Sequence, residues 1–332
     1  MKLLKLVPDN TNIRFLRWRV PFYAVSLLLM AASLLLVFTK GLNLGVDFVG
    51  GQMIRVTFER SATAPIAALR DEIDALGFGE PTLQEFGKPN QVSIRMRLPE
   101  GAEKDPAIAE QMSAKIIATI QAKHADARLD GNDTVSGKVS GELFSSGMLA
   151  LGLAMVAISI YIWVRFEWQF GVGALFALVH DVTLTLGLFA VTQMEFDLNI
   201  VAALLTLIGY SLNDTIVIYD RIRENLKKYR RMPMPELLDL SVNETLSRTI
   251  VTSLSVALVL AILLFLGPDV IFGFTASMLL GIVVGTFSSI YVAAAILLWL
   301  RLKPDSFVPK EEAAPVKGAR KTASGVDFKD MP

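Results

Sequence analysis

The stretch Leu143–Val164, LFSSGMLALGLAMVAISIYIWV, contains no charged side chain and is long enough to cross a membrane. About 20 apolar residues in a helix span the roughly 30 Å of hydrocarbon in a bilayer. Five further stretches have the same character, although two of them hold ionisable groups. They are Val20–Phe38, Phe170–Val191, Leu198–Tyr219, Thr249–Leu266 and Ile271–Leu300. The sequence therefore predicts an α-helical polytopic membrane protein with six transmembrane helices.

Composition narrows the class of function. Apolar residues make up 53% of the 332 residues and charged residues only 19%, with 32 Lys and Arg against 32 Asp and Glu. This neutral balance argues against a nucleic-acid partner, and the apolar runs imply contact with membrane lipid. The chain has no cysteine, and its only histidines are His124 and His180. Thiol catalysis is excluded, and a histidine metal site or a Ser-His-Asp triad is not expected.

Basic residues predict the orientation. They are concentrated in the segments 1–19, 220–248 and 301–332, whereas the short turns 193–197 and 267–270 have none. Lys and Arg next to membrane spans stay on the cytoplasmic side. Both termini, the second of which we expect to be a disordered tail, are therefore predicted to be cytoplasmic. The first apolar stretch is too long for a signal-peptide core, so we interpret it as an uncleaved anchor.

Residues 39–142 separate the first two spans and are predicted to form a folded periplasmic domain. Their pattern predicts the order strand, helix, strand, strand, helix, strand, which is typical of a ferredoxin-like α+β sandwich. A turn is expected at 87–90, between the second and third strands. The predicted strands are Met53–Phe58, Thr82–Phe86, Val92–Leu98 and one within Ala127–Val139, and the predicted helices are Ala64–Leu76 and Asp105–Lys123.

Asp214 lies inside the fourth apolar stretch, where a charge costs about 2.5–3.5 kcal/mol on insertion scales. Arg248 begins the fifth stretch at a similar depth from the same side, so the two can pair if their helices touch. Two interpretations are open. Asp214 binds and releases protons with an affinity that Arg248 tunes, or the pair is static and locks helix packing. Asn213 and Ser211 add hydrogen-bonding groups beside it.

His180 and Asp181 lie near the middle of the third stretch. We favour a structural role for them, because neighbouring residues on a helix point in different directions. Asp181 is kept as a weaker member of a proton pathway.

Two further patterns indicate packing. Small residues recur every four positions in the last apolar stretch, at Ser277, Gly281, Gly285 and Ser289. That spacing lets helices approach closely, within the bundle or against a partner subunit. Residues 235–246 read as a short amphipathic surface helix, with Leu237, Leu238, Val242 and Leu246 facing inward.

Several motifs match a known family. They are GVDFVGG at 45–51, GYSLNDTIVIYDRIREN at 209–225, TLSRT at 245–249 and SSIY at 288–291. Together with the layout of spans, they resemble the SecF family of the bacterial Sec translocase, within the SecD/SecF family and the resistance-nodulation-division superfamily. The resemblance covers about residues 15 to 300. The motif at 209–225 is long and specific, whereas the Gly-Gly motif alone is weak.

The resemblance implies a function. Members pair with SecD, associate with the SecYEG channel and the ATPase SecA, and use the proton motive force to help pull preproteins outward across the inner membrane. Asp214 matches the family's proton-pathway aspartate, and Arg248 matches a basic residue implicated with it. The implied protein is a transport subunit rather than an enzyme, and it carries protons rather than a bound cofactor.

Asp47, Gly50 and Gly51 match a family motif at the base of the outside domain. One interpretation is a tight turn in which glycine permits positive φ, and the other is a hinge that carries membrane movement into the domain. Two alternatives to the translocase function also stay open. They are a proton-coupled exporter of small molecules or lipids, and a passive scaffold.

Overall fold

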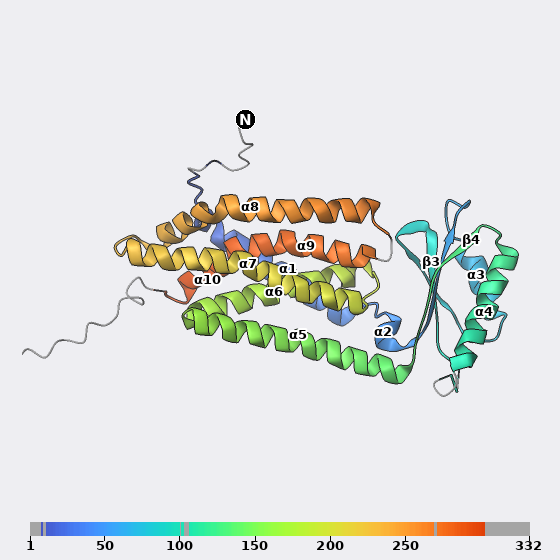
Figure 1. Cartoon of the computed structure of the whole chain (residues 1–332). Helices are drawn as coiled ribbons and strands as arrows, with labels where there is room; N and C mark the ends of the chain where they lie inside the picture. The colour runs from blue at the N-terminus through green and yellow to red at the C-terminus, as the bar shows by residue number, and fades with distance from the viewer. Residues whose placement is uncertain (1–7, 9–10, 100, 103–105, 269–270, 303–332) are drawn as a thin grey trace, which may run out of the picture.

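The computed structural model describes residues 8, 11–99, 101–102, 106–268 and 271–302. Within these ranges six helices are long and apolar enough to cross a membrane, which confirms the predicted fold class. Figure 1 shows them side by side as an elongated bundle, with a sheet domain at one end. Most of the predicted cytoplasmic tails, residues 1–7, 9–10 and 303–332, lie outside the described residues.

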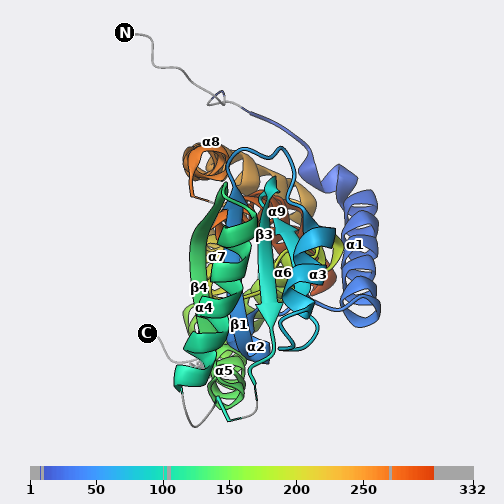
Figure 2. The same ribbon diagram turned by 90° about the vertical axis from the view of Figure 1, so that its right-hand side faces the viewer.

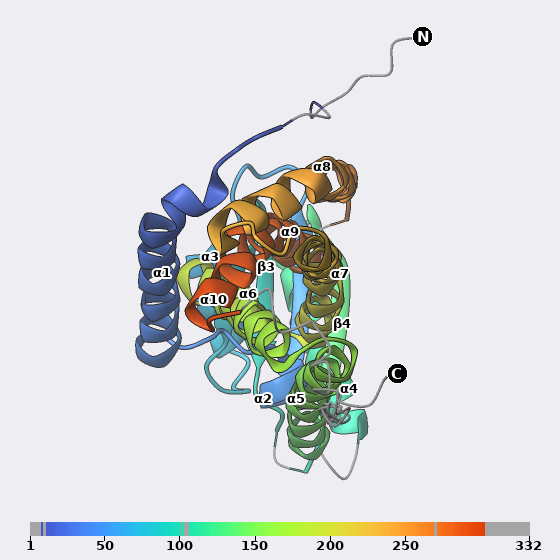
Figure 3. The same cartoon turned by 90° about the vertical axis from the view of Figure 1, so that its left-hand side faces the viewer.

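The bundle divides into inner and outer helices. The most apolar part of α6 (Trp168–Thr192), α7 (Leu198–Lys228) and the final span is 61%, 56% and 56% buried. The corresponding shares of α1 (Arg19–Thr39), α5 (Gly137–Arg165) and α8 (Met234–Leu266) are 17%, 11% and 17%. Viewed along the bundle, α1, α5 and α8 lie on three different sides (Figure 3). Their apolar outer faces are suited to lipid or to a partner subunit.

The final span is interrupted where a single helix was predicted over 271–300. It consists of α9 (Phe272–Ser288), a π-helical turn η3 (Ser289–Ala293) and α10 (Ala294–Trp299). Single π turns inside helices occur frequently at functional sites. At the same end of the bundle, a short 3₁₀ turn η1 (Phe15–Trp18) leads into α1, and Phe15 contacts Tyr291 of η3.

Helices α7 and α8 are longer than the predicted spans 198–219 and 249–266. They extend into the predicted basic loop 220–248 and leave only residues 229–233 as the connection between them. The reason is that the amphipathic segment is continuous with the fifth span instead of forming a separate helix. Its inward face is confirmed, because Leu237, Leu238, Val242 and Leu246 are all buried. An ion pair of 2.7 Å between Arg221 and Glu244 joins the two extensions.

The sheet domain, which is the domain predicted to lie outside, has the predicted element order. It contains β1 (Gly51–Phe58), α3 (Ile66–Asp74), β2 (Thr82–Phe86), β3 (Lys88–Met96), α4 (Pro106–Lys123) and β4 (Ala127–Val135). The sheet order is β2-β3-β1-β4 with every pair antiparallel, as in a ferredoxin-like fold. Figure 2 shows α3 and α4 on the face away from the bundle. The turn predicted at 87–90 is reduced to Gly87, because Phe86 already pairs with Lys88.

The two faces of this sheet differ in chemistry. Alternate residues such as Ile54, Val56 and Ile94 are buried and form a core with α3 and α4. The opposite face carries polar side chains, among them Arg55 and Arg95. This polar face is turned toward the outer end of the bundle, so its side chains can contact the membrane helices.

Candidate functional site

Asp214 lies on α7 with only 3% of its surface exposed. Ser253 on α8 donates a hydrogen bond from Oγ to Asp214 Oδ2, at 3.3 Å. The Ser253 hydroxyl in turn accepts a bond of 2.8 Å from Thr286 Oγ1 on α9. Asn213 Nδ2 lies 3.5 Å from the other carboxylate oxygen. The carboxylate is therefore the end of a hydroxyl chain that joins three helices.

Arg248 does not form the expected ion pair. Among the described residues, no ion pair within 4 Å joins Asp214 and Arg248, and the Arg248 side chain is exposed. Arg248 and Ser253 are five residues apart on α8, which places them about 140° apart around the helix. Ser253 therefore occupies the position facing Asp214.

A second carboxylate, Asp181 on α6, is more deeply buried and has more hydrogen bonds. It is 1% exposed, and its Oδ2 accepts bonds from Ser211 on α7 at 2.6 Å and from Ser288 on α9 at 2.9 Å. Its Oδ1 lies 2.9 Å from His180 Nδ1. The prediction that His180 and Asp181 point in different directions is therefore wrong. Their side chains turn toward each other because both are enclosed by neighbouring helices.

The row of small residues in the final span brings these groups together. A Cβ atom added to Gly285 would lie 3.1 Å from Ser211 Cβ, and one added to Gly281 would meet the Leu207 side chain. Both contacts are with α7, so the row packs inside the bundle. Ser277 and Ser289 are likewise buried. The close approach of α7 and α9 allows Ser211 and Ser288 to reach the same carboxylate oxygen.

The Gly-Gly motif forms a tight connection between a one-turn helix α2 (Val46–Val49) and β1. Gly50 and Gly51 have φ of 76° and 124°, values that favour glycine. A Cβ on Gly51 would lie 2.6 Å from the Met96 carbonyl oxygen, and one on Gly50 would lie 3.1 Å from Gly137 Cα. The tight turn anticipated for these glycines is present, and it packs against the start of α5.

Asp47 connects the same motif to α7. Its Oδ2 accepts a hydrogen bond of 3.0 Å from the backbone N–H of Leu198, the first residue of α7. Asp197 is the N-cap of the helix and accepts a bond of 3.1 Å from the Ile200 N–H. A carboxylate at a helix N-terminus also interacts favourably with the helix dipole. Asp214 lies on the same helix, about 24 Å from this end.

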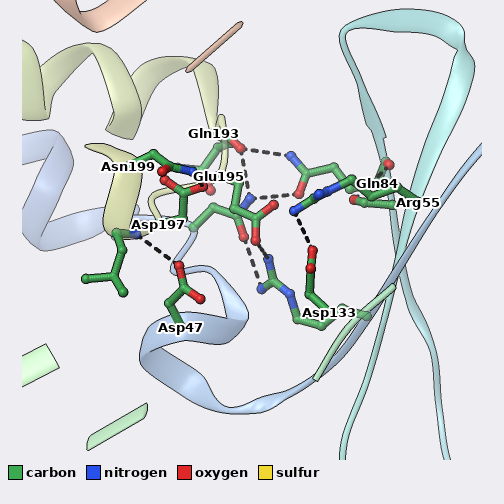
Figure 4. Close-up of polar contacts among 12 residues, drawn as sticks. Asp47, Arg55, Gln84, Asp133, Gln193, Glu195, Asp197 and Asn199 are labelled. Carbon is green, nitrogen blue, oxygen red and sulfur yellow. Dashed lines mark hydrogen bonds and ion pairs between the residues drawn. The ribbon is translucent and has the colours of Figure 1, made fainter. Parts of the chain in front are cut away.

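The turn between α6 and α7 contacts the polar face of the sheet (Figure 4). The Gln193 carbonyl accepts bonds from Gln84 Nε2 at 2.8 Å and from Asn43 Nδ2 at 3.0 Å. Glu195 forms an ion pair of 3.4 Å with Arg95 on β3. We call this contact region, made of Asn43, Asp47, Gln84, Arg95, Gln193, Glu195 and Asp197, the outer junction.

Of the residues in the outer junction, the sequence motifs identified only Asp47, together with the neighbouring glycines Gly50 and Gly51. The sequence gives only a weak indication of this contact. Arg95 lies on the solvent-facing side of an alternating strand, and the acids Glu195 and Asp197 lie close together in a short turn. Nothing local in the sequence pairs these two features. The contact joins residues one hundred positions apart.

Burial raises the pKa of the Glu195 carboxyl, and the nearby Arg95 and Arg55 guanidinium groups oppose that effect. Burial also raises the pKa of Asp197, against the hydrogen bond from the Ile200 N–H. Both acids therefore hold a proton more readily than an exposed carboxyl does. Within the described residues, no group of three or more His, Asp or Glu side chains is placed to bind a metal ion.

Six membrane helices, an α+β domain at one end and carboxylates buried in the bundle define a multi-pass membrane protein of the transport class. Two family models match the chain. SecD/SecF GG Motif covers residues 35–62, and Protein export membrane protein SecD/SecF, C-terminal, covers residues 115–303. The chain therefore belongs to the SecD/SecF family, and its relatives place it with SecF as an auxiliary inner-membrane subunit of Sec protein export.

Two of these relatives are described as protein translocase subunit SecF. The one from Rhodobacter capsulatus is 44% identical over 90% of this chain and 92% of its own length. The one from Vibrio alginolyticus is 38% identical over 99% of this chain and all of its own length. These matches confirm the family indicated by the sequence motifs.

Solved structures show the same fold. The crystal structure of SecDF from Thermus, described as a translocon-associated membrane protein, matches with a TM-score of 0.79 and 32% identity over 88% of this chain. A SecDF structure in a super-membrane-facing form matches with a TM-score of 0.61 and 31% identity over the same share. The chain spans 39% of the length of each of these SecDF chains.

Proposed function

We propose that this chain works with a SecD subunit to couple the proton motive force to late-stage translocation of preproteins across the inner membrane. SecYEG and SecA form the wider complex. The transported protons are the only cofactor, and no covalent catalysis takes place. The Thermus neighbour, in which SecD and SecF are named together, supports the SecD partnership. The buried carboxylates of the bundle support the proton-coupled role.

The proposed orientation places both termini in the cytoplasm. The described start of the chain, its described end and the connection between α7 and α8 all lie at the bundle end opposite the sheet domain (Figure 1). That end also carries the basic residues of the α7 and α8 extensions. The positive-inside rule assigns this end to the cytoplasm and the sheet domain to the periplasm.

The observation that carries the proposal is the position of Asp214 near the middle of α7, whose N-terminal end is bound to the Gly-Gly motif through Asp47. Protonation of Asp214 removes the negative charge that the Ser253 and Thr286 hydroxyl chain stabilises. The packing of α7 against α8 and α9 then changes. Because a helix transmits displacement along its axis, the change reaches Asp47 and the outside domain, with the Gly-Gly motif as the hinge.

The available energy sets the size of each step. One proton moving down a 100 mV potential releases about 2.3 kcal/mol. That amount biases a two-state element by about fifty-fold. Each step is modest, so the proposal requires repeated cycles for each preprotein.

The test is Asp214→Asn in the full chain, assembled with its partner in native membrane vesicles. We expect normal assembly and loss of proton-driven export, with ATP-driven export retained. Asp220→Asn is the matched control, since it lies on the same helix and its side chain is half exposed. Normal export by Asp214→Asn contradicts the proposal and favours a scaffold. Intact export with altered drug or lipid sensitivity favours an exporter.

The roles of Arg248 and Asn213 are tested separately. Arg248 acts on Asp214 through space, so Arg248→Lys is expected to retain most of the export activity and Arg248→Ala to reduce it. Asn213→Ala removes the amide beside Asp214 Oδ1 and is expected to have a smaller effect.

A further inference from the structure

His180 and Asp181 form an isolated acid–base unit in the middle of the bundle. Their side chains are 0% and 1% exposed, and their contact is the only ion pair of Asp181 among the described residues. The other partners of Asp181, Ser211 and Ser288, are hydroxyl donors. An ionised carboxylate fits this arrangement, because it accepts hydrogen bonds and cannot donate them. His180 is then the one group in contact that can balance its charge.

The second ring nitrogen of His180 has no hydrogen-bond partner. Nε2 is buried, and no donor or acceptor of the described residues reaches it. A protonated ring leaves a buried N–H unpaired, whereas a ring protonated only at Nδ1 leaves the Asp181 charge uncompensated. Each state therefore has one unfavourable feature, either an unpaired buried donor or an uncompensated buried charge. Because neither arrangement satisfies every buried group, the geometry suits a group that exchanges a proton.

The face of α6 that carries His180 packs against α1, because Gly187 lies two turns further along the same face. The two helices run in the same direction, from the cytoplasmic end toward the sheet domain (Figure 1). A Cβ on Gly187 would lie 3.2 Å from Ser33 Cα, which fixes their register. Two helical turns earlier, the same register places Ser26 at the level of His180. The Ser26 hydroxyl is also buried, and no hydrogen-bond partner for it is found among the described residues.

Aromatic rings hold the imidazole in this position. The His180 ring stacks on Phe287 at 6.5 Å between centroids, and Phe287 contacts Phe22 of α1. Phe287 precedes Ser288, the residue that binds Asp181 and ends α9 before the π turn η3. A change of charge on the histidine–aspartate unit therefore acts directly on the point where the final span is irregular.

Other titratable groups at membrane depth lie on the helices packed against α6. None of those in the described residues forms a hydrogen bond or ion pair with His180 or Asp181. They are Asp214, Tyr210 and Tyr219 on α7, Tyr23 on α1, Tyr161 on α5 and Tyr291 in η3. Asp214 is bound to Ser253 on α8 instead, so the two carboxylates have separate hydrogen-bond partners.

We propose that His180 and Asp181 are a second proton-binding unit of the bundle, which takes up and releases one proton at His180 Nε2 and transmits the change of charge to α7 and α9 through Ser211 and Ser288. This inference rests on the proposed function and adds His180 as a proton-carrying residue. Uptake leaves His180 with protons on both nitrogens. Release from Nε2 restores the ring with its proton on Nδ1, bonded to Asp181.

The direct test is ¹⁵N nuclear magnetic resonance of the full chain with labelled histidine. Because the chain has only two histidines, His124→Gln leaves His180 as the single signal. We expect the chemical shift of Nε2 to change from that of a protonated nitrogen to that of an unprotonated one as the buffer goes from acidic to alkaline. In Asp181→Asn this change is expected to occur over a different pH range. A signal that keeps one protonation state throughout overturns the inference.

The functional test compares His180→Asn with the unaltered chain in vesicles. Asparagine can still donate to Asp181 from a position close to that of Nδ1, but it cannot carry a proton. We expect normal assembly and a fall of roughly tenfold in proton-driven export, within the usual range of coupling between sites. His180→Asn with full export overturns the inference. If both His180→Asn and Asp214→Asn leave proton-driven export intact, the proposed function fails as well. If Asp214→Asn loses this export and His180→Asn keeps it, only the role of His180 is removed.

Discussion

Two regions of the molecule bind α7 through different kinds of contact. One is the polar centre of the bundle, around Asp181 and Asp214, and the other is the outer junction. In the centre, two carboxylates are bound mainly by single hydroxyl donors from neighbouring helices. At the outer junction, carbonyl, amide, guanidinium and carboxylate groups form several contacts at once. Under the proposed function, one proton changes the charge of the centre, whereas the junction has redundant contacts. In that proposal, the proton-responsive site lies near the middle of α7 and the rigid attachment lies at its N-terminal end.

The largest effect is expected from Gly51→Ala, which breaks the attachment itself. The new Cβ would collide with the Met96 carbonyl at a backbone φ that disfavours alanine. We expect the outside domain to lose at least about 2 kcal/mol of stability, from backbone strain and overpacking together. Thermal unfolding of the full chain measures the loss. Gly41→Ala is the control, because Gly41 has φ of 75° but open space around its Cβ; equal losses in both variants would show that the contact with Met96 is unimportant.

Gly285→Ala tests the centre by separating α7 from α9. Its Cβ would come within 3.1 Å of Ser211 Cβ, so the helices must move apart and Ser211 must shift from Asp181. Overpacking of this kind costs about 1–3 kcal/mol. We expect lower thermal stability and lower export.

The matched control is Gly209→Ala on the neighbouring helix. Its Cβ meets nothing within 4 Å, and alanine in a helix interior is favoured over glycine by about 0.5–1 kcal/mol. Loss of stability in Gly209→Ala as large as in Gly285→Ala would mean that close packing of α7 on α9 does not explain the result.

Asp47→Ala tests whether the attachment carries movement from the centre. The change removes the acceptor of the Leu198 N–H, and a lost helix-capping bond costs about 0.5–2 kcal/mol. We expect a small loss of stability but a clear fall in proton-driven export. Asp133→Ala is the control, since Asp133 is a half-exposed acid paired with Arg55 on the same sheet. Equal export by the two variants would contradict a transmitting role for Asp47.

The smallest effect concerns pH at the outer junction. Burial raises the pKa of Glu195 in the docked arrangement, so docking binds a proton more tightly than separation does. Docking therefore gains stability as pH falls from the raised pKa toward the ordinary value of 4.5, and loses it as pH rises through the raised pKa. We expect a narrower distribution of distances between the domain and the bundle in acid.

Pulsed electron paramagnetic resonance can measure this distribution, with spin labels on the variants Ala114→Cys and Thr192→Cys combined. The native chain has no cysteine, so no background labelling occurs. Glu195→Gln should reduce the pH dependence, because glutamine resembles the protonated carboxyl. An unchanged dependence in that variant would assign it to Asp197 or to another group.

Features that depend on a local pattern of residues could be predicted from the sequence. The long apolar runs predicted the six spans, since a membrane requires a continuous apolar length. Alternation in β3 and helical spacing in α4 gave the element order of the outside domain. Acids inside apolar runs, at 181 and 214, were identifiable because their burial has a cost at any position in a bundle.

Only the tertiary structure decided which groups face those acids. The partners of Asp214 and Asp181, Ser253 and Ser288, lie 39 and 107 positions away in the sequence, and the Asp47 bond to α7 spans 151. Such contacts depend on the rotation and register of packed helices, which local periodicity does not specify. The sequence by itself determined the membrane fold and the acids inside it. Packing decided that Asp214 meets Ser253 rather than Arg248, and that His180 meets Asp181.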